Sequence, residues 1–337
     1  MKKYILAIVS ALMLFSSCTH KDLCLHHRDH AHKYHINIVA DYRFDWEEHL
    51  GGPNWQQNWP ENYVEYNSLR PSKPKGIRVI NYNQNGDNNI HNIGPDGGTV
   101  VLYEGPNDIL LYNNDTEYII FSRADNSAST RATTRTRTRA TYNGSEYANE
   151  GEETMTPPDA LFANYILGYI PEKVSIPTDI EVTMHPLVFT YKIRYEFQSG
   201  IEYVALARGA LSGMARSVLI NSGETSQEGA TLLYDCTKAD WGIRAYVNSF
   251  GIPAYPNENY PSRQAPKHAL NLEILLKNGS MITFDYDVTA QVQAQPHGGV
   301  IVVKDIVIKP EDGTQGSGSF DVEVNDWGPY QDIYLPL

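Results

Sequence analysis

Apolar and polar residues alternate in short runs along most of the chain, a pattern typical of β-strands with one buried face. The clearest run covers residues 187–197, where odd positions are aromatic or aliphatic and even positions are mostly Thr, Lys, Arg and Glu. Two further runs, 270–276 and 281–288, flank Asn278-Gly279, the strongest hairpin signal in the sequence. These patterns predict half-buried strands joined by tight turns.

Other β-rich runs recur along the chain, separated by turn pairs such as Gly97-Gly98. They lie at residues 36–46, 75–82, 99–103, 109–112, 118–122, 180–184, 203–208, 217–220, 230–234, 242–247, 300–308 and 320–324. Only short helices fit between them, so the sequence predicts an all-β protein. The length favours two β-sandwich domains in tandem, which we place at residues 35–185 and 186–337.

The N-terminus has the pattern of an export signal. A short basic start precedes a 12-residue apolar run at residues 4–15, which suits a signal-peptide core and is too short to span a bilayer. Two serines then precede Cys18, which resembles a bacterial lipobox, although Phe15 stands where an aliphatic residue is usual. We therefore expect a signal peptide at residues 1–17 and lipid attachment at Cys18. Residues 18–34 would form a His-rich tether at the outer membrane, on the cell surface.

Composition and motifs narrow the range of functions. The net charge of −13 argues against nucleic acid as a partner. The sequence has no P-loop, no G-x-S-x-G elbow and no H-E-x-x-H motif, so we predict neither an enzyme nor a cofactor. Five histidines at residues 26–35 have spacings that suit a transition metal, but a flexible tether does not fix a coordination geometry, and we predict no metal site.

Residues 129–141 (STRATTRTRTRAT) are the one basic island of this acidic chain. Its arginines are Arg131, Arg135, Arg137 and Arg139, and the last three alternate as on one face of a strand. Three interpretations stay open. The island is a solvated edge strand or loop, a contact for an acidic partner, or a cut site for an arginine-specific protease.

Aromatic residues crowd the first long loop, where Trp46, Trp55 and Trp59 are followed by Tyr63 and Tyr66. Such a loop either packs its own aromatics down as a lid or presents them as a platform for a glycan. On the second interpretation the three tryptophans are the stacking residues.

Several short motifs carry a family resemblance. They are KDLC at 21–24 after Cys18, FDW at 44–46, YNNDT at 112–116, DALF at 159–162, MHP at 184–186, LSGMA at 211–215, DVT at 287–289 and FDVEVNDW at 320–327. Together they resemble a family of bacterial surface lipoproteins whose shared domain has no assigned function. This family is related to fimbrillins and to the fimbrillin-associated anchor proteins of type V pili. The resemblance implies two tandem transthyretin-like β-sandwiches and a role in anchoring or assisting a fimbrium.

The resemblance also gives the chain end a candidate role, because type V pilins polymerise when one subunit donates an extended strand to its neighbour. Residues 328–337 are short and apolar at intervals, and the candidate donor-strand residues are Gly328, Pro329, Tyr330, Ile333, Leu335 and Leu337. The alternative is an ordinary last strand that completes its own domain.

These observations lead to one main hypothesis and one alternative. The main hypothesis is a membrane-tethered surface lipoprotein with a structural, anchoring or adhesive role in fimbria-like assembly, with fimbrillin-like pilus subunits as partners. The alternative is a surface lipoprotein of a polysaccharide-uptake system, with a glycan as its partner.

Overall fold

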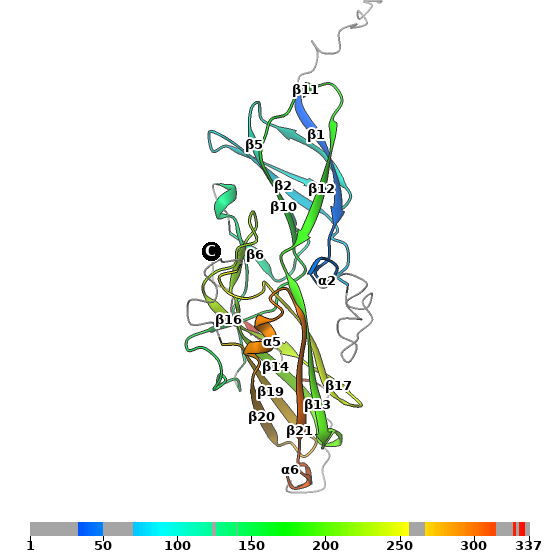
Figure 1. Ribbon diagram of the computed structural model, residues 1–337, viewed down its shortest axis with the longest axis vertical. Helices are drawn as coiled ribbons and strands as arrows, with labels where there is room; N and C mark the ends of the chain where they lie inside the picture. The colour runs from blue at the N-terminus through cyan, green and yellow to red at the C-terminus, as the bar shows by residue number, and fades with distance from the viewer. Residues whose placement is uncertain are drawn as a thin grey trace, which may run out of the picture.

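The computed structural model describes residues 33–49, 70–122, 126–139, 141–255, 267–314, 326–327 and 330–333. They form an elongated molecule built of β-sheets placed end to end (Figure 1), so the all-β prediction is confirmed. The helices are short: α2 (Asp45–His49), α5 (Thr289–Gln293), α6 (Pro310–Thr314), and the 3₁₀ turns η4 (Ser127–Ser129) and η5 (Ile201–Tyr203).

No helix within the described ranges is long and apolar enough to cross a membrane. The predicted signal peptide, Cys18 and nearly all of the predicted tether lie outside the described residues.

An eight-stranded sheet forms the part of the molecule that we call the N-terminal body, at the top of Figure 1. In pairing order its strands are β11 (Lys173–Val174), β1 (Lys33–Tyr42), β12 (Thr178–Pro186), β10 (Phe162–Tyr169), β5 (Asn107–Asn113), β2 (Ile77–Asn83) and β3 (Asn88–Ile93), with β4 (Gly97–Leu102) also paired to β1. The sheet folds over a core that includes Ile36, Ile77, Ile109 and Phe162. Alternating apolar positions therefore supply the driving force for this body.

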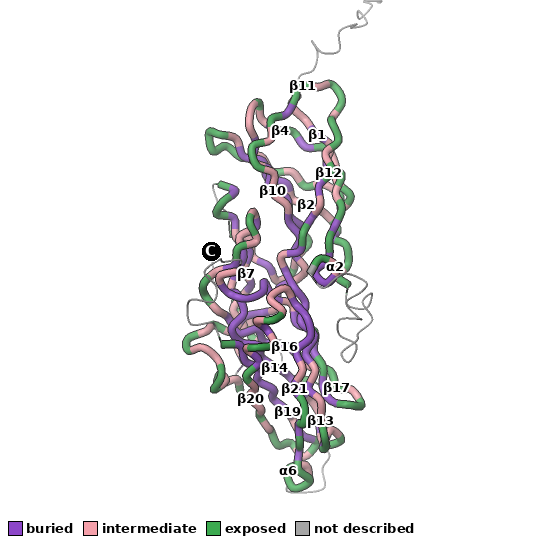
Figure 2. Tube along the Cα trace, in the orientation of Figure 1, coloured by how far each residue is buried: buried purple, intermediate pink, exposed green. Residues whose placement is uncertain are grey.

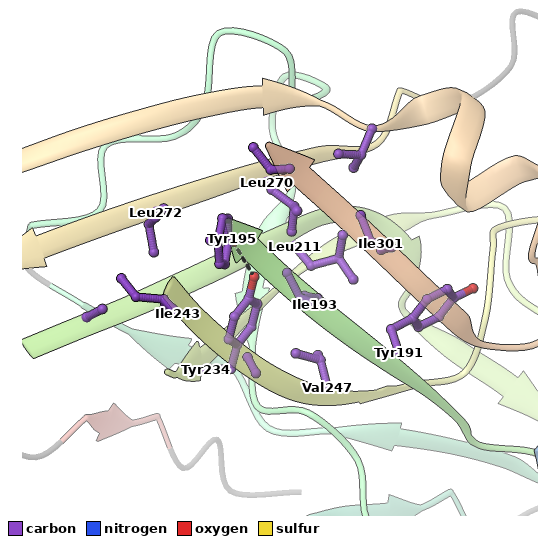
Figure 3. Packing of buried hydrophobic residues seen from close by; sticks show 14 of the residues in the cluster. Tyr191, Ile193, Tyr195, Leu211, Tyr234, Ile243, Val247, Leu270, Leu272 and Ile301 are labelled. Carbon is purple, nitrogen blue, oxygen red and sulfur yellow. Dashed lines mark hydrogen bonds between the residues drawn. The ribbon is translucent and has the colours of Figure 1, made fainter. Parts of the chain in front are cut away.

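Two sheets form the C-terminal body. The four-stranded sheet has the order β17 (Thr237–Ala239), β18 (Gly242–Ser249), β13 (Phe189–Ser199) and β21 (Gly299–Val307). The five-stranded sheet has the order β20 (Met281–Asp287), β19 (Ala269–Leu276), β14 (Val204–Ala215), β16 (Gly229–Asp235) and β9 (Glu153–Met155). Their facing sides enclose the largest apolar cluster of the described chain (Figure 3).

The core of the C-terminal body contains one polar link between its two sheets. The hydroxyls of Tyr195 and Tyr234 lie 3.0 Å apart and share a hydrogen bond, drawn in Figure 3. The Tyr234 ring lies against Gly209 of the neighbouring strand, where an added Cβ would come within 2.4 Å of that ring. Glycine at this position therefore allows a large aromatic residue to lie flat on the sheet.

The sequence patterns of this body are confirmed. Tyr191, Ile193 and Tyr195 of β13 all point into the core, as the alternation at 187–197 predicts. The runs around Asn278-Gly279 form the β19–β20 hairpin, and Gly279 has the positive φ of 82° that the turn requires.

A small sheet and an apolar cluster join the two bodies. A small sheet of β6 (Ile119–Phe121), β7 (Arg131–Thr134) and β15 (Ser217–Leu219) lies between them, over a cluster that takes residues from both bodies. Figure 2 accordingly shows buried residues at the junction as well as inside each body. Strands β7 and β9 precede residue 186 in sequence yet pair with β15 and β16 of the C-terminal region. The predicted domain division at residue 186 therefore does not separate all of the strand pairing.

Candidate strand-docking site

The end of the chain pairs with the basic island. Strand β22 (Gln331–Asp332) runs antiparallel to β8 (Arg137–Thr138), with Gln331 opposite Thr138 and Asp332 opposite Arg137. The backbone N–H of Ile333 continues the ladder and donates to the Thr136 carbonyl at 2.9 Å. Two segments that the sequence analysis identified separately are thus brought together, and we call this pairing the docking site.

Strand β8 also connects to the five-stranded sheet. Thr136 forms an isolated bridge with Met155 of β9, and the Thr156 N–H donates to the Arg135 carbonyl at 3.0 Å. Among the described residues, β22 is therefore the outermost strand on this side of the C-terminal body. An outermost strand shows one row of backbone donors and acceptors to its surroundings.

Side chains reinforce the short ladder. Arg137 Nε donates to Asp332 Oδ1 at 2.9 Å, and the Arg137 guanidinium carbon lies 4.6 Å from the centre of the Tyr330 ring. The Tyr330 hydroxyl donates to Asp235 Oδ1 at 2.7 Å. Burial, together with the adjacent Asp235 carboxylate, raises the pKa of Tyr330 above its usual value. Both Arg137 and Asp332 are only partly buried, so the ion pair contributes modestly to stability.

A buried charge network lies beneath Trp327. Its ring centre is 3.9 Å from the Arg208 guanidinium carbon, and Arg208 Nε donates to Glu273 Oε2 at 2.9 Å. Arg139 Nη2 donates to Glu273 Oε1 at 3.2 Å, and the Thr141 hydroxyl donates to Glu273 Oε2 at 2.8 Å. Residue Glu273 is only 2% exposed. One buried carboxylate therefore holds two guanidinium groups, and both carboxylate oxygens are used.

The four arginines of the island have different surroundings. Arg137 belongs to the docking site and Arg139 to the buried network around Glu273. Arg131 lies in β7 and donates through Nη1 to the Ser217 hydroxyl at 3.0 Å. Arg135 lies between β7 and β8, with its carbonyl bonded to Thr156. A protease would have to open β8 before it could cleave next to Arg137 or Arg139, since cleavage concentrates at exposed loop tips.

The aromatic loop is described only at its start. Trp46 lies in α2, is 2% exposed, and donates through Nε1 to the Thr190 carbonyl at 3.0 Å. The neighbouring Asp45 carboxylate accepts from the Thr190 N–H at 2.8 Å, and burial raises the pKa of Asp45 to about 6. Helix α2 thus connects the end of β1 to the start of β13. The expectation that the first strand extends over residues 44–46 is wrong, because β1 ends at Tyr42 and α2 begins at Asp45.

This burial rules out Trp46 as a glycan-stacking residue, which was one of the two interpretations left open for the loop, because its ring faces are covered by protein. Trp55 and Trp59 lie outside the described residues, as do Gly328, Pro329, Leu335 and Leu337 at the chain end. Within the described ranges, no group of three or more His, Cys, Asp or Glu side chains is arranged to hold a metal ion.

The opposite edge of the C-terminal body is closed in another way. Strand β21 is the last strand of the four-stranded sheet, and its outer backbone groups bond to two glutamine side chains. Gln291 accepts from the Val302 N–H at 2.8 Å and donates to the Val302 carbonyl at 3.0 Å. Gln295 makes the same pair of bonds with Val300, at 2.8 and 3.1 Å. The two amides replace a neighbouring strand, and neither the glutamines nor the Glu273 network was expected from the sequence.

Known proteins resemble this chain along most of its length. The family described as "Domain of unknown function (DUF5119)" matches residues 64–235. A Bacteroides ovatus protein with the provisional name fimbrium anchoring subunit Fim4B is 21% identical over 360 aligned residues, covering 98% of this chain and 97% of that protein.

Solved structures resemble it too. A crystal structure of a provisionally assigned adhesin from Bacteroides ovatus has a TM-score of 0.55 and 18% identity, covering 90% of this chain and 99% of that one. The fimbrial anchor protein Mfa2 from Porphyromonas gingivalis has a TM-score of 0.41 and 10% identity, covering 80% and 90%. The adhesin supports the fold described above.

Proposed function

Because the chain belongs to the DUF5119 family, we propose that it is a cell-surface subunit with a structural, anchoring or adhesive role in fimbria-like assembly. In this proposal a lipid on Cys18 tethers the protein to the outer membrane, and the docking site exchanges strands with fimbrillin-like subunits. The similarity to a relative named as a fimbrium anchoring subunit, over almost the full length of both chains, supports the role.

The observation that carries the proposal is the pairing of β22 with β8. The ladder is short, lies at the outer side of the C-terminal body, and is formed by the last described residues of the chain. A strand held in this way can be replaced by an equivalent strand from another molecule, because main-chain hydrogen bonds accept any sequence. The same segment can be donated to a neighbour. An ordinary last strand remains the competing interpretation.

The position at which β1 begins fits an anchoring role. Strand β1 begins at the end of the N-terminal body that is farthest from the C-terminal body (Figure 1). A lipid-bearing segment that precedes β1 would therefore leave from one end of the long axis. The docking site lies well away from that end, where an incoming subunit would not meet the membrane. Two or more acyl chains on Cys18 would make such attachment stable.

Membrane fractionation tests the tether. We expect the wild-type chain in the carbonate-washed membrane fraction and the Cys18→Ala chain in the soluble fraction. Cys24→Ala, the matched control, should stay with the membrane. Retention of the Cys18→Ala chain in washed membranes would contradict lipid tethering.

Crosslinking followed by purification tests the assembly role separately. Purification of the crosslinked wild-type chain should recover a fimbrillin-like shaft protein. If the protein is tethered but no shaft protein is recovered, the assembly role fails while the lipid anchor stands.

A further inference from the structure

The outer side of the four-stranded sheet carries a group of cations and aromatic rings that the proposed function does not use. It consists of Lys192 and Arg194 of β13, Arg244 and Tyr246 of β18, and Trp241 in the turn before β18. The alternate residues of both strands point into the core, so these side chains all lie on the opposite, outward side. We call this group the cationic face.

The pairing register concentrates positive charge on this face. Arg194 lies directly opposite Arg244, and Lys192 lies opposite Tyr246. Like charges in directly opposed positions destabilise a sheet. Glu196 forms an ion pair with Arg194 at 2.8 Å, whereas Arg244 makes no hydrogen bond or ion pair with any described residue. Placing Arg244 opposite Arg194 therefore does not stabilise the sheet.

Lys192 is the most unusual member. It is only 5% exposed, and its ammonium group has no hydrogen-bond or ion-pair partner within the described chain. Burial and the nearby Arg194 and Arg244 lower the pKa of Lys192 to about 8, against the opposing effect of Glu196. The Nζ atom is not among the fully buried, unpartnered polar atoms of the described residues, so the stem is buried while the ammonium reaches the surface of the face. An incoming anion would therefore find a cation already held in place.

The aromatic residues lie beside these cations. Trp241 is 37% exposed and its ring centre lies 4.5 Å from the Arg194 guanidinium carbon, while Tyr246 is 44% exposed. Each ring thus offers apolar area next to a positive charge, on a chain whose net charge is −13. Rings of this kind bind partners that are apolar on one surface and polar at their edges.

We propose that the cationic face binds an anionic polysaccharide, whose carboxylate or sulfate groups pair with Lys192 and Arg244 and whose sugar rings pack on Tyr246 and Trp241. An acidic protein fits less well. A stable protein interface buries about 800 Å² per partner and has an apolar core, whereas this face has three cations and two exposed rings. None of its residues belongs to the docking site, so it does not depend on the proposed function.

Binding measurements on the purified full chain test this inference. The probes are dextran sulfate and polygalacturonate, with neutral dextran as the matched control. We expect at least one of the two anionic glycans to bind, the affinity to fall with added salt, and dextran not to bind. The double variant Lys192→Gln/Arg244→Gln should lose about tenfold in affinity or more, because it removes both cations that pair with the anionic groups. Lys173→Gln in β11, a remote exposed lysine, should change the affinity less than about twofold.

Two further measurements test the roles of Lys192 and of the aromatic rings. Raising the pH from 7 to 9 should weaken binding by the wild type more than by Lys192→Gln, because Lys192 loses its proton in that interval; the charged or titratable neighbours that face it are Arg194, Arg244, Glu196 and Tyr246. Tyr246→Ala should weaken glycan binding while leaving the thermal midpoint nearly unchanged.

Each contrary outcome overturns the inference. It is wrong if neither anionic glycan binds, or if the double variant, shown to be folded by circular dichroism, binds as well as the wild type. Poly-glutamate that binds as tightly as the glycans, and is insensitive to Tyr246→Ala, would assign the face to an acidic protein instead.

Discussion

The two outer edges of the C-terminal body are covered by different means. At β21, Gln291 and Gln295 use four side-chain hydrogen bonds to satisfy the backbone of Val300 and Val302. At β8, the covering group is a two-residue strand that comes from the far end of the chain, 195 residues from Arg137. One edge is closed by side chains that are close in sequence, and the other by a segment that can leave without disturbing its neighbours.

The difference indicates which edge is suited to exchange. Side-chain amides that imitate a strand block edge-to-edge pairing permanently, since Gln291 lies in α5 and Gln295 lies in the short turn between α5 and β21. A terminal strand can detach with little loss of core contacts, because the described side-chain contacts of residues 326–333 come from Trp327, Tyr330 and Asp332 and lie outside the apolar clusters. The comparison therefore predicts a rigid edge at β21 and a replaceable one at β8.

The largest expected effect on stability comes from the buried Glu273 network, which lies beneath Trp327. Replacing the buried carboxylate in Glu273→Gln would leave Arg139 and Arg208 without their counter-charge. We expect the free energy of unfolding to fall by about 3–5 kcal/mol, measured by urea denaturation. Glu311→Gln on the exposed α6 helix should change it by less than about 0.5 kcal/mol. A loss below about 1 kcal/mol for Glu273→Gln would mean that the network does not support the docking site.

Acid should weaken the same sheet through His268, at the start of β19. This ring is fully buried, and burial lowers the pKa of His268 to about 4. The unfolded chain therefore binds more protons than the folded chain between pH 4 and about 6.5, and stability falls as the pH is lowered through this range. The contribution of His268 alone is a loss of about 2 kcal/mol between pH 7 and pH 5.

A His268→Gln chain isolates this contribution, because Asp45 works in the opposite direction. The raised pKa of Asp45 means that its protonation favours the folded chain as the pH falls towards 5. Of these two shifts only that of Asp45 remains in the variant, so its stability should rise between pH 7 and pH 5 relative to that of the wild type. Equal slopes in the two chains would show that His268 is not the titrating group.

Opening the β21 edge should have a smaller effect on stability and a visible effect on association. The double variant Gln291→Ala/Gln295→Ala removes four hydrogen bonds and uncovers backbone groups of Val300 and Val302. We expect a loss of about 2 kcal/mol and the appearance of dimers or larger species in sedimentation velocity. Gln198→Ala, at an exposed position of β13, is the control. A variant that stays monomeric would argue against the amides as an edge block.

The smallest effect on stability should come from the contacts between β8 and the end of the chain. Arg137→Ala removes a partly exposed ion pair and a ring contact, so the free energy of unfolding should fall by about 1 kcal/mol or less. Hydrogen exchange should nevertheless speed up at residues 331–333 while Val300 and Val302 stay protected. Uniformly faster exchange at both edges would contradict a difference between them.

Much of the fold follows from local patterns. The alternation at 187–197 predicts which residues of β13 face the core, and Asn278-Gly279 predicts the β19–β20 hairpin, because both depend on neighbouring residues alone. An edge strand was one of the interpretations left open for the basic island, where β7 and β8 lie, and β9 was not expected. These polar segments pair with β15, β22 and β16, which lie far away in the sequence. Tertiary contacts decide the structure there, and local preference does not.

The docking site was predictable only in parts. The sequence indicates a basic island and a terminal strand, but it does not show that Asp332 meets Arg137. Glu273 and Arg208 sit in strands whose pattern suggests exposed positions, and they are buried because the segment after β8 crosses over them. Trp46 was expected at the end of the first strand, with a packed-down loop and a glycan platform both left open, and the Thr190 backbone accepts its N–H at the junction of the two bodies.

Photo-crosslinking in cells tests the central claim most directly. A benzoyl-phenylalanine at Thr138, opposite Gln331, reports what lies against β8 in the assembled fibre. The account predicts a light-dependent adduct between this chain and a fimbrillin-like shaft subunit, and none from the same probe at Val302 on the covered edge. Adducts from Thr138 only to the chain's own terminal segment, in cells that display fimbriae, would contradict it.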